Sequence, residues 1–335
     1  MLRFILRRLL LLVPVLLGIS VLTFVLSHVM PGDPARLIAG PHAGEAQVAA
    51  TRRAFGLDKP LWTQYGVYMA GLARGDLGVA LHTQRPVSSD LRAFFPATLE
   101  LALAAMILAI VVGVPLGTLA AAHRNRAIDH LTRVLALGGV SMPIFWVALL
   151  LQILFYYRLG WFPSDGRLDN GLAPPPSITG LYTVDALLTG HVNLFINALW
   201  HLALPAVVLS FGAVAVIMRM TRSSLLEVLG RQYIRTAKAK GLGYWRVVLR
   251  HGLRNALLPT ITVLGLQFGY LLGGTVLVEY IFSWPGIGLY TAQSIVSSDY
   301  PAIMGVTALI AFLYVLVNLL VDVCYAAINP RIRLG

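Results

Sequence analysis

Long apolar runs alternate with shorter polar segments along most of the chain. Six of these runs reach the roughly 20 residues that an α-helix needs to cross a bilayer. They lie at 9–30, 99–121, 134–157, 201–220, 256–278 and 302–321. Their few charged residues, such as Glu100 and Arg219, fall within one turn of an end. The pattern therefore predicts an all-α, polytopic membrane protein with six transmembrane helices.

Composition supports a membrane protein. Of the 335 residues, 58% are hydrophobic and only 12% are charged, which is outside the usual range of globular proteins. The first run follows three arginines, as a signal peptide would, but its apolar stretch is too long and no small-residue cleavage site follows. We therefore expect a retained membrane anchor. Because Cys324 is the only cysteine, an intramolecular disulfide and a cysteine-based metal cluster are excluded.

Positive charge gathers on one side of the predicted topology. With the N-terminus in the cytoplasm, the inner segments carry 17 lysines and arginines against 3 acidic residues, and the outer segments carry 9 against 11. Cytoplasmic loops normally hold such an excess. We therefore expect both termini in the cytoplasm. The inner segments in this arrangement are 1–8, 122–133, 219–255 and 322–335.

The most basic stretch, residues 231–259, contains no acidic residue. Within 244–257, arginines recur every four residues, which predicts an amphipathic helix with one basic face. Before it, YIRTAKAK predicts a shorter helix that ends near Gly241, since glycine permits a left-handed turn. Ala237 and Gly241 are small and four residues apart, so we expect a shallow notch there. Pro259 is expected to open the fifth span.

Three kinds of partner could explain the basic stretch. Nucleic acid is disfavoured, because no set of base-stacking aromatic residues and no known nucleic-acid-binding fold accompanies the charge. An ordinary loop that fixes topology and touches anionic membrane lipid stays open on chemistry alone. A protein partner is the third candidate.

A set of short motifs runs along most of the chain. The basic stretch carries RTAKAKGL and LRNALLP. The other motifs are MLRFILRRLLLLVP, PGDP at 31–34, GLDKPLWTQY at 56–65, GDLG at 75–78, FPATLELA at 95–102, SMPIFW at 141–146, RMTRSSLLEVL at 219–229, EYIFSWPGIG at 279–288 and NPRIR at 329–333. Together they resemble the inner-membrane permease subunits of dipeptide, oligopeptide and nickel ABC importers. At the generic glutamate-alanine-alanine position of the importer docking motif the chain has Arg235, Thr236 and Ala237, which resembles this branch.

The resemblance implies a type I ABC importer architecture in the bacterial inner membrane. Residues 1–98 would form an anchor and an extracytoplasmic loop, and 99–335 the permease domain, with a cytoplasmic coupling loop at 222–255. It also implies a homologous second permease, two ABC ATPase subunits that bind ATP and Mg²⁺, and an extracytoplasmic substrate-binding protein. Residues expected to contact the ATPase are Arg235, Thr236, Ala237, Lys238, Ala239, Lys240, Gly241, Leu242 and Gly243.

The chain lacks the motifs of an ATPase or a hydrolase. None of its lysines, Lys59, Lys238 and Lys240, lies in a GxxxxGK[ST] loop, so ATP must be hydrolysed by another chain. It has no G-x-S-x-G elbow and no H-E-x-x-H zinc helix, and its histidines are scattered. We therefore expect a transport subunit that is not an enzyme and holds no metal or cofactor of its own.

Polar and small residues inside the spans are the candidates for the pathway and for packing. Gln152, Gln267 and Asn318 either line a pathway or form interhelical hydrogen bonds. Gly265, Gly269 and Gly273 form a stripe that favours close helix packing. A proton- or sodium-driven carrier is disfavoured, because ionisable residues near mid-membrane and repeated halves are both missing from the sequence.

The substrate is the least determined part of the sequence. The branch resemblance favours short peptides, and the spans have no cluster of His, Cys or acidic residues that would suit a bare metal ion. A nickel chelate or glutathione is the alternative within this class. From a different class, a stand-alone lipid-associated membrane protein stays open.

Overall fold

The computed structural model describes residues 13–25, 33–40, 42–54 and 56–328. Within these ranges it holds helices and one isolated β-bridge, between Val79 and Pro86, and no strand. The predicted all-α class is confirmed. The chain divides into two compact units, residues 1–95 with 289–315 and residues 96–288 with 316–335.

The first described helix of the first unit is a short apolar one, Val13–Val25. The phenyl ring of Phe24 meets Tyr65 edge to face, with ring centroids 5.3 Å apart, and the hydroxyl oxygens of Ser20 and Tyr65 lie 2.9 Å apart. Its other helices are α2 (Pro34–Ala39), α3 (Glu45–Ala54), α4 (Leu61–Arg74), the start of α5 (Val87–Ala122), most of α14 (Ile287–Val296) and the start of α15 (Tyr300–Ile328).

Two buried carboxylates tie the distant segments of the first unit together. Asp90 accepts hydrogen bonds from the Thr83 hydroxyl at 2.5 Å and from the Tyr290 hydroxyl at 3.2 Å. Asp299 accepts the backbone N–H of His82 at 2.9 Å. Because a buried carboxylate needs such partners, these bonds hold the polar turn before α5 against the C-terminal helices of this unit.

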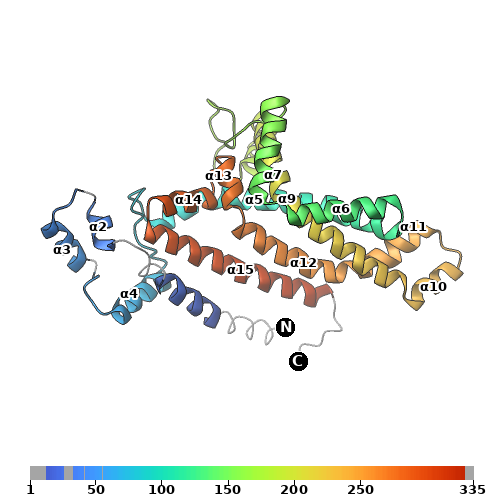
Figure 1. Cartoon of the computed structure of the whole chain (residues 1–335), viewed down its shortest axis with the longest axis horizontal. Coiled ribbons are helices and arrows are strands. Elements are labelled where there is room, and N and C mark those ends of the chain that lie inside the picture. The colour runs from blue at the N-terminus through green and yellow to red at the C-terminus, as the bar shows by residue number, and fades with distance from the viewer. Residues whose placement is uncertain (1–12, 26–32, 41, 55, 329–335) are drawn as a thin grey trace. The chain divides into compact units, whose positions relative to one another are not determined.

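The second unit is the larger of the two, and Figure 1 labels its helices α6, α7, α9, α10, α11, α12 and α13. It includes the rest of α5 and of α15, with the helices between them. These are α6 (Ala127–Ser141), α7 (Ile144–Leu151), the π-helical turn η1 (Gln152–Arg158), α8 (Tyr182–Leu188), α9 (Val192–Leu229), α10 (Gln232–Ala239), α11 (Tyr244–Arg246), the π-helical turn η2 (Val247–Leu253), α12 (Arg254–Gly273) and α13 (Val276–Ile281).

Helix α9 is the centre of the second unit, because α6, α7, α8 and α12 all contact it. Glycines on the neighbouring helices allow the close approach. A Cβ atom on Gly117 of α5 would lie 2.5 Å from the carbonyl oxygen of Met218, and one on Gly139 of α6 would lie 2.7 Å from the Ala215 Cβ. Small residues at such contacts let helix backbones meet, which is how membrane helices pack without a hydrophobic driving force.

The structure supports some, but not all, of the six predicted transmembrane spans. Among the described residues, four single helices are long and apolar enough to cross a membrane: Val87–Ala122, Val192–Leu229, Tyr244–Gly273 and Tyr300–Val321. The third predicted run falls on two helices bent by 107°, Ala127–Ser141 and Ile144–Arg158, which together are long and apolar enough to make a fifth span if they count as one. The bend has a local cause, since Met142 precedes Pro143 and is held in an extended conformation. The first run lies partly outside the described residues, so the described helices do not establish six spans.

The helix at the end of the basic stretch differs from its prediction. The arginine-bearing helix is continuous with the fifth span, so that residues 244–273 form one helix instead of a separate surface helix followed by a span that Pro259 opens. Pro259 lies inside α12. The span also ends earlier than predicted, at Gly273, and α13 follows after a two-residue break.

Candidate functional site

The predicted docking residues form a short helix and the turn after it. Helix α10 carries Arg235, Thr236, Lys238 and Ala239 on exposed positions, and Lys240 ends it. Gly241 then takes a left-handed conformation, with φ of 77°, as predicted. A Cβ atom at Gly241 or Gly243 would meet no atom within 4 Å, so this turn presents open backbone.

Ala237 does not belong to the exposed notch that its spacing from Gly241 predicted. It is buried, and it packs with Ile234 against Val247 of η2, with Leu229 and Leu242 beside them. This small apolar cluster fixes α10 on the rest of the second unit. The surface formed by residues 232–246, here called the α10–α11 surface, therefore presents the cations and the glycine turn but not Ala237.

A buried ion pair supports this surface from the preceding helices. Asp129 of α6 is fully buried and receives two hydrogen bonds from Arg222 of α9, at 2.6 and 2.9 Å. It also accepts the backbone N–H of Asn125 at 2.9 Å, which closes the turn between α5 and α6. Two-point contact of this kind fixes orientation as well as charge. The turn is tied to α11 as well, because the Tyr244 hydroxyl donates to the Ala122 carbonyl at 2.6 Å.

The predicted glycine stripe of α12 is split by the fold. Gly265 faces α15 so closely that a Cβ atom there would lie 1.8 Å from Cγ2 of Val321. Gly269 is buried, whereas Gly273 is exposed at the end of the helix. The close contact made by Gly265 lies within the second unit of this chain.

The three predicted pathway residues are not brought together. Gln267 of α12 lines a cavity of 380 Å³, whereas Asn318 is half-buried on α15 and is outside its lining. Gln152 instead donates its side-chain amide to the carbonyl of Ser164 at 2.9 Å, which anchors the segment after η1. Of these three residues, Gln267 alone is therefore positioned to contact a molecule bound in the cavity.

The cavity forms where the backbone leaves regular helix. Its walls come from the bend between α6 and α7, from the middle of α9 and from α12. Irregular backbone at membrane depth is tolerated where it is buried in protein or lines a cavity. The lining is mainly apolar, with Gln267 and Tyr270 as its polar side chains, and includes Met142, Pro143, Phe211 and Leu271.

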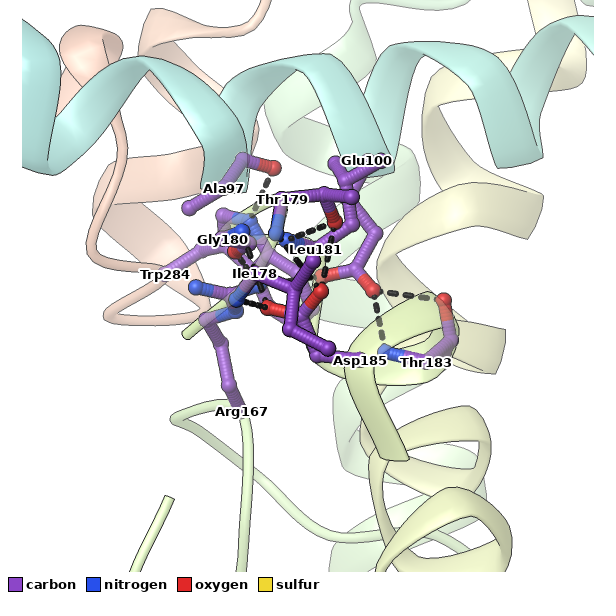
Figure 2. Close-up of polar contacts among 10 residues, drawn as sticks. All are labelled: Ala97, Glu100, Arg167, Ile178, Thr179, Gly180, Leu181, Thr183, Asp185 and Trp284. Carbon is purple, nitrogen blue, oxygen red and sulfur yellow. Dashed lines mark hydrogen bonds and ion pairs between the residues drawn. The ribbon is translucent and has the colours of Figure 1, made fainter. Parts of the chain in front are cut away.

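A second polar site, at the opposite end of α9 from α10, was missed from the sequence (Figure 2). We call it the α8 cluster: Glu100, Arg167, Thr179, Gly180, Thr183 and Asp185. Arg167 and Glu100 are both nearly fully buried, and their closest nitrogen and oxygen lie 2.5 Å apart. The other oxygen of Glu100 accepts the N–H of Thr183 at 2.7 Å and its hydroxyl at 2.6 Å. The guanidinium of Arg167 also lies 3.4 Å from the ring centre of Tyr182.

Asp185 closes the α8 cluster on its other side. Its carboxylate accepts the backbone N–H groups of Ile178, Thr179 and Gly180 at 2.8 to 3.2 Å, and the Thr179 hydroxyl at 2.7 Å. Burial raises the pKa of this carboxyl, but the hydrogen bonds from Thr179 and its neighbours outweigh burial, so that the pKa lies below its ordinary value. The cluster thus holds the long segment between η1 and α9 as a fixed cap.

Two of the family motifs meet beside this cluster. The Thr98 hydroxyl, from FPATLELA, donates to Glu279 at 2.7 Å and accepts the N–H of Ile287 at 2.8 Å. The indole of Trp284 donates to the Ala97 carbonyl at 2.8 Å. A Cβ atom on Gly286 would lie 2.4 Å from the Thr98 hydroxyl oxygen, so only glycine fits in this turn. The two motifs therefore pack against each other and form a structural joint. Each motif is visible in the sequence, but their contact is not.

No group of three or more His, Cys, Asp or Glu side chains among the described residues is placed to hold a metal ion. The buried acidic residues of the second unit are instead satisfied by arginine, threonine or backbone N–H partners, as described above. The second unit thus presents an exposed cationic surface at one end of α9 and an apolar cavity beside its middle.

Comparison with known proteins finds relatives along nearly the whole chain. The family model described as "Binding-protein-dependent transport system inner membrane component" matches residues 113–334, and the model of its N-terminal part matches residues 1–102. The probable D,D-dipeptide transport system permease protein of Escherichia coli (strain K12) is 51% identical over 97% of this chain and 95% of its own length. The glutathione transport system permease protein of Escherichia coli O6:H1 is 40% identical over 99% of both chains.

A solved structure supports the same fold. An inward-facing conformation of the MetNI methionine ABC transporter matches with a TM-score of 0.51 and 20% identity, over 70% of this chain and 93% of that chain. At this identity the match carries the fold alone. It agrees with the type I importer architecture that the sequence motifs predicted.

Proposed function

Because this chain belongs to the family of binding-protein-dependent transport system inner membrane components, we propose that it forms the pathway through which an ATP-driven importer moves short peptides across the bacterial inner membrane. The observation that carries the peptide assignment is the 51% identity to a D,D-dipeptide permease along 97% of the chain. The family membership itself argues against the stand-alone lipid-associated protein that the sequence left open.

The α10–α11 surface is the site that would transmit the work of ATP hydrolysis. Its exposed cations and the open backbone of the Gly241 turn offer contacts to a protein groove, and its apolar underside and the Asp129–Arg222 pair keep it rigid. Charges at such an interface chiefly set orientation and association rate. In this proposal two ABC ATPase subunits dock from the cytoplasm and bind ATP and Mg²⁺, and this chain holds no cofactor and is not an enzyme.

The remaining partners follow from the same architecture. A homologous second permease would complete the pathway, and an extracytoplasmic binding protein would deliver the substrate. The positive charge of the segments around α10 supports a cytoplasmic position for that end and for both termini. The α8 cluster would then cap the extracytoplasmic end of the second unit.

The 380 Å³ cavity beside α9 is the proposed segment of the pathway in this chain. Its volume falls in the range of about 300–1,000 Å³ that is usual for small-molecule sites. Apolar walls with few polar groups suit a substrate whose side chains vary, because a tightly matched polar pocket would reject most of them. Glutathione, itself a tripeptide, is the second candidate, because a glutathione permease is 40% identical to this chain. A nickel chelate is the third.

Uptake measurements test the assignment. In cells that lack this chain, uptake of a labelled dipeptide should fall to background, and the intact chain should restore it. Gln267→Leu should lower restored uptake by about 2- to 10-fold, the equivalent of one hydrogen bond. Asn318→Leu, outside the cavity, is the matched control and should restore uptake fully. If dipeptide uptake does not depend on the chain while glutathione or nickel uptake does, the peptide assignment is wrong.

A further inference from the structure

A second hollow of the molecule, distinct from the pathway cavity, lies beside the turn between α5 and α6. It has a volume of 680 Å³ and is lined by the end of α5, by that turn, by the end of α9 and by the start of α11. Its polar side chains are His123, Arg124, Arg126 and Tyr244, with Trp245 beside them. None of the lining residues is acidic.

The two arginines in this hollow have no carboxylate partner in the part of the chain that the structure describes. The nearest acidic side chain in sequence, Asp129, is already held by Arg222 and lies 3.7 Å from Arg133. Glu227 is bonded to Arg231. Arg124 and Arg126 are exposed and carry uncompensated positive charge into the hollow.

The hollow is also fixed in shape. Asn125, between the two arginines, has φ of 62° and donates its backbone N–H to the buried carboxylate of Asp129. The Tyr244 hydroxyl joins the other wall to the Ala122 carbonyl at 2.6 Å. Because both walls are tied by these bonds, the arginines are presented from a rigid turn instead of a free loop.

Apolar surface begins directly beside the arginines. On α6, the helix that follows Arg126, Ile128, Leu131 and Leu135 are 43%, 60% and 50% exposed. Two aromatic rings with polar atoms, Tyr244 and Trp245, stand half-exposed at the edge of the hollow. Such rings gather at the boundary between the hydrocarbon and the headgroups of a membrane. The hollow is therefore a cationic pocket with exposed apolar residues of α6 following it in the chain, and its aromatic rings suit the level of lipid headgroups.

We propose that this hollow binds one anionic phospholipid, with its phosphate between Arg124 and Arg126 and its acyl chains along the exposed face of α6. Basic pockets between membrane helices on the cytoplasmic side suit anionic headgroups. Because the Tyr244 bond joins the hollow to the start of α11, the bound lipid would stabilise the base of the α10–α11 surface. The binding claim does not depend on which substrate the importer carries.

Native mass spectrometry of the full chain in detergent tests the proposal, with phosphatidylglycerol and phosphatidylcholine of identical acyl chains as probes. The chain should retain phosphatidylglycerol in preference. Arg124→Gln with Arg126→Gln should weaken this binding about 100-fold, since each lost arginine removes a hydrogen bond to the charged phosphate that contributes about 10-fold. The paired lysine variants, Arg124→Lys with Arg126→Lys, should restore most of it.

Arg250→Gln with Arg254→Gln is the matched control, because it removes the same charge from exposed residues that do not line the hollow. It should change phosphatidylglycerol binding by less than about 3-fold, because exposed charges outside the hollow attract the lipid only through solvent-screened electrostatics. Equal losses in the two pairs would overturn the proposal in favour of general surface charge. Equal retention of the two lipids, or displacement of phosphatidylglycerol by soluble glycerol phosphate, would also overturn it. The proposal would also be overturned if Arg124→Gln with Arg126→Gln kept phosphatidylglycerol but lost co-purification with the ATPase subunits, because the hollow would then be a contact site for protein.

Discussion

The two ends of α9 are both rich in charge, but they use it in opposite ways. At the α8 cluster, Arg167 and Glu100 are buried together and every charge found there meets a partner inside the chain. On the α10–α11 surface, Arg235, Lys238 and Lys240 are exposed, and the apolar side of the helix faces inward. A buried charge must be paired or it destabilises the fold, whereas an exposed one is available to a partner.

The two ends of the second unit therefore have different roles. The charges of the α8 cluster are paired with one another and stabilise the fold, whereas the polar groups of the α10–α11 surface are available to another molecule. Composition alone does not distinguish them, since both are polar stretches between apolar runs. Three experiments test the contrast, beginning with the largest expected effect.

Sidedness gives an all-or-none difference between the two ends. In a chain with Cys324→Ser, single cysteines are introduced as Leu172→Cys, in the segment held by the α8 cluster, and as Ala239→Cys, on α10; both positions are exposed. A membrane-impermeant thiol reagent added outside spheroplasts should label the first and not the second. Labelling at Ala239→Cys after the membrane is permeabilised is the control. The reverse pattern would invert the proposed orientation and place the α10–α11 surface outside.

Removal of one arginine at each end should affect stability very differently. Arg167→Met leaves Glu100 buried without its cation and should lower the free energy of unfolding by about 3–5 kcal/mol. Arg235→Met removes an exposed charge and should change it by less than about 0.5 kcal/mol. Unfolding of the purified chain in detergent measures both. The double variant Arg167→Met with Glu100→Gln should recover part of the loss, and similar stability of the two single variants would contradict the contrast.

Glycine substitutions give the smallest and most specific effects. Gly286→Ala drives a methyl group into Thr98 and Glu279, so it should cost about 1–3 kcal/mol of stability. Gly241 has open space but a left-handed backbone, so Gly241→Asn should be tolerated, since asparagine adopts that conformation. Gly241→Trp should keep the fold at a cost of about 1 kcal/mol and lose co-purification with the ATPase subunits.

Normal recovery of the ATPase subunits with Gly241→Trp would remove the turn from the docking role. Loss of the ATPase subunits with Gly241→Asn as well would mean that any side chain at this position, and not only a bulky one, blocks the contact. A melting curve unchanged by Gly286→Ala would show that the joint between the two family motifs is looser than its packing indicates.

The apolar runs, the basic stretch and the family motifs could all be identified from the sequence, because each depends on residues close together in the chain. Run length predicts helices, and glycine at 241 predicts a left-handed turn, since these depend on local backbone energetics. The distribution of lysine and arginine also predicts the orientation of the chain in the membrane. These local signals were sufficient for the all-α class and for the family.

Only the tertiary structure decided which polar residues work together. Glu100 and Arg167 are 67 positions apart, and Thr98 and Glu279 are 181 apart, so no local pattern could pair them. The same holds for Ala237, whose spacing predicted an exposed notch until packing on Val247 buried it. The sequence does not distinguish the three amides in apolar runs, Gln152, Gln267 and Asn318. The structure shows that, of these three, Gln267 lines the cavity. Sequence spacing fixes the face of a helix that a residue occupies, but what that face meets depends on long-range packing.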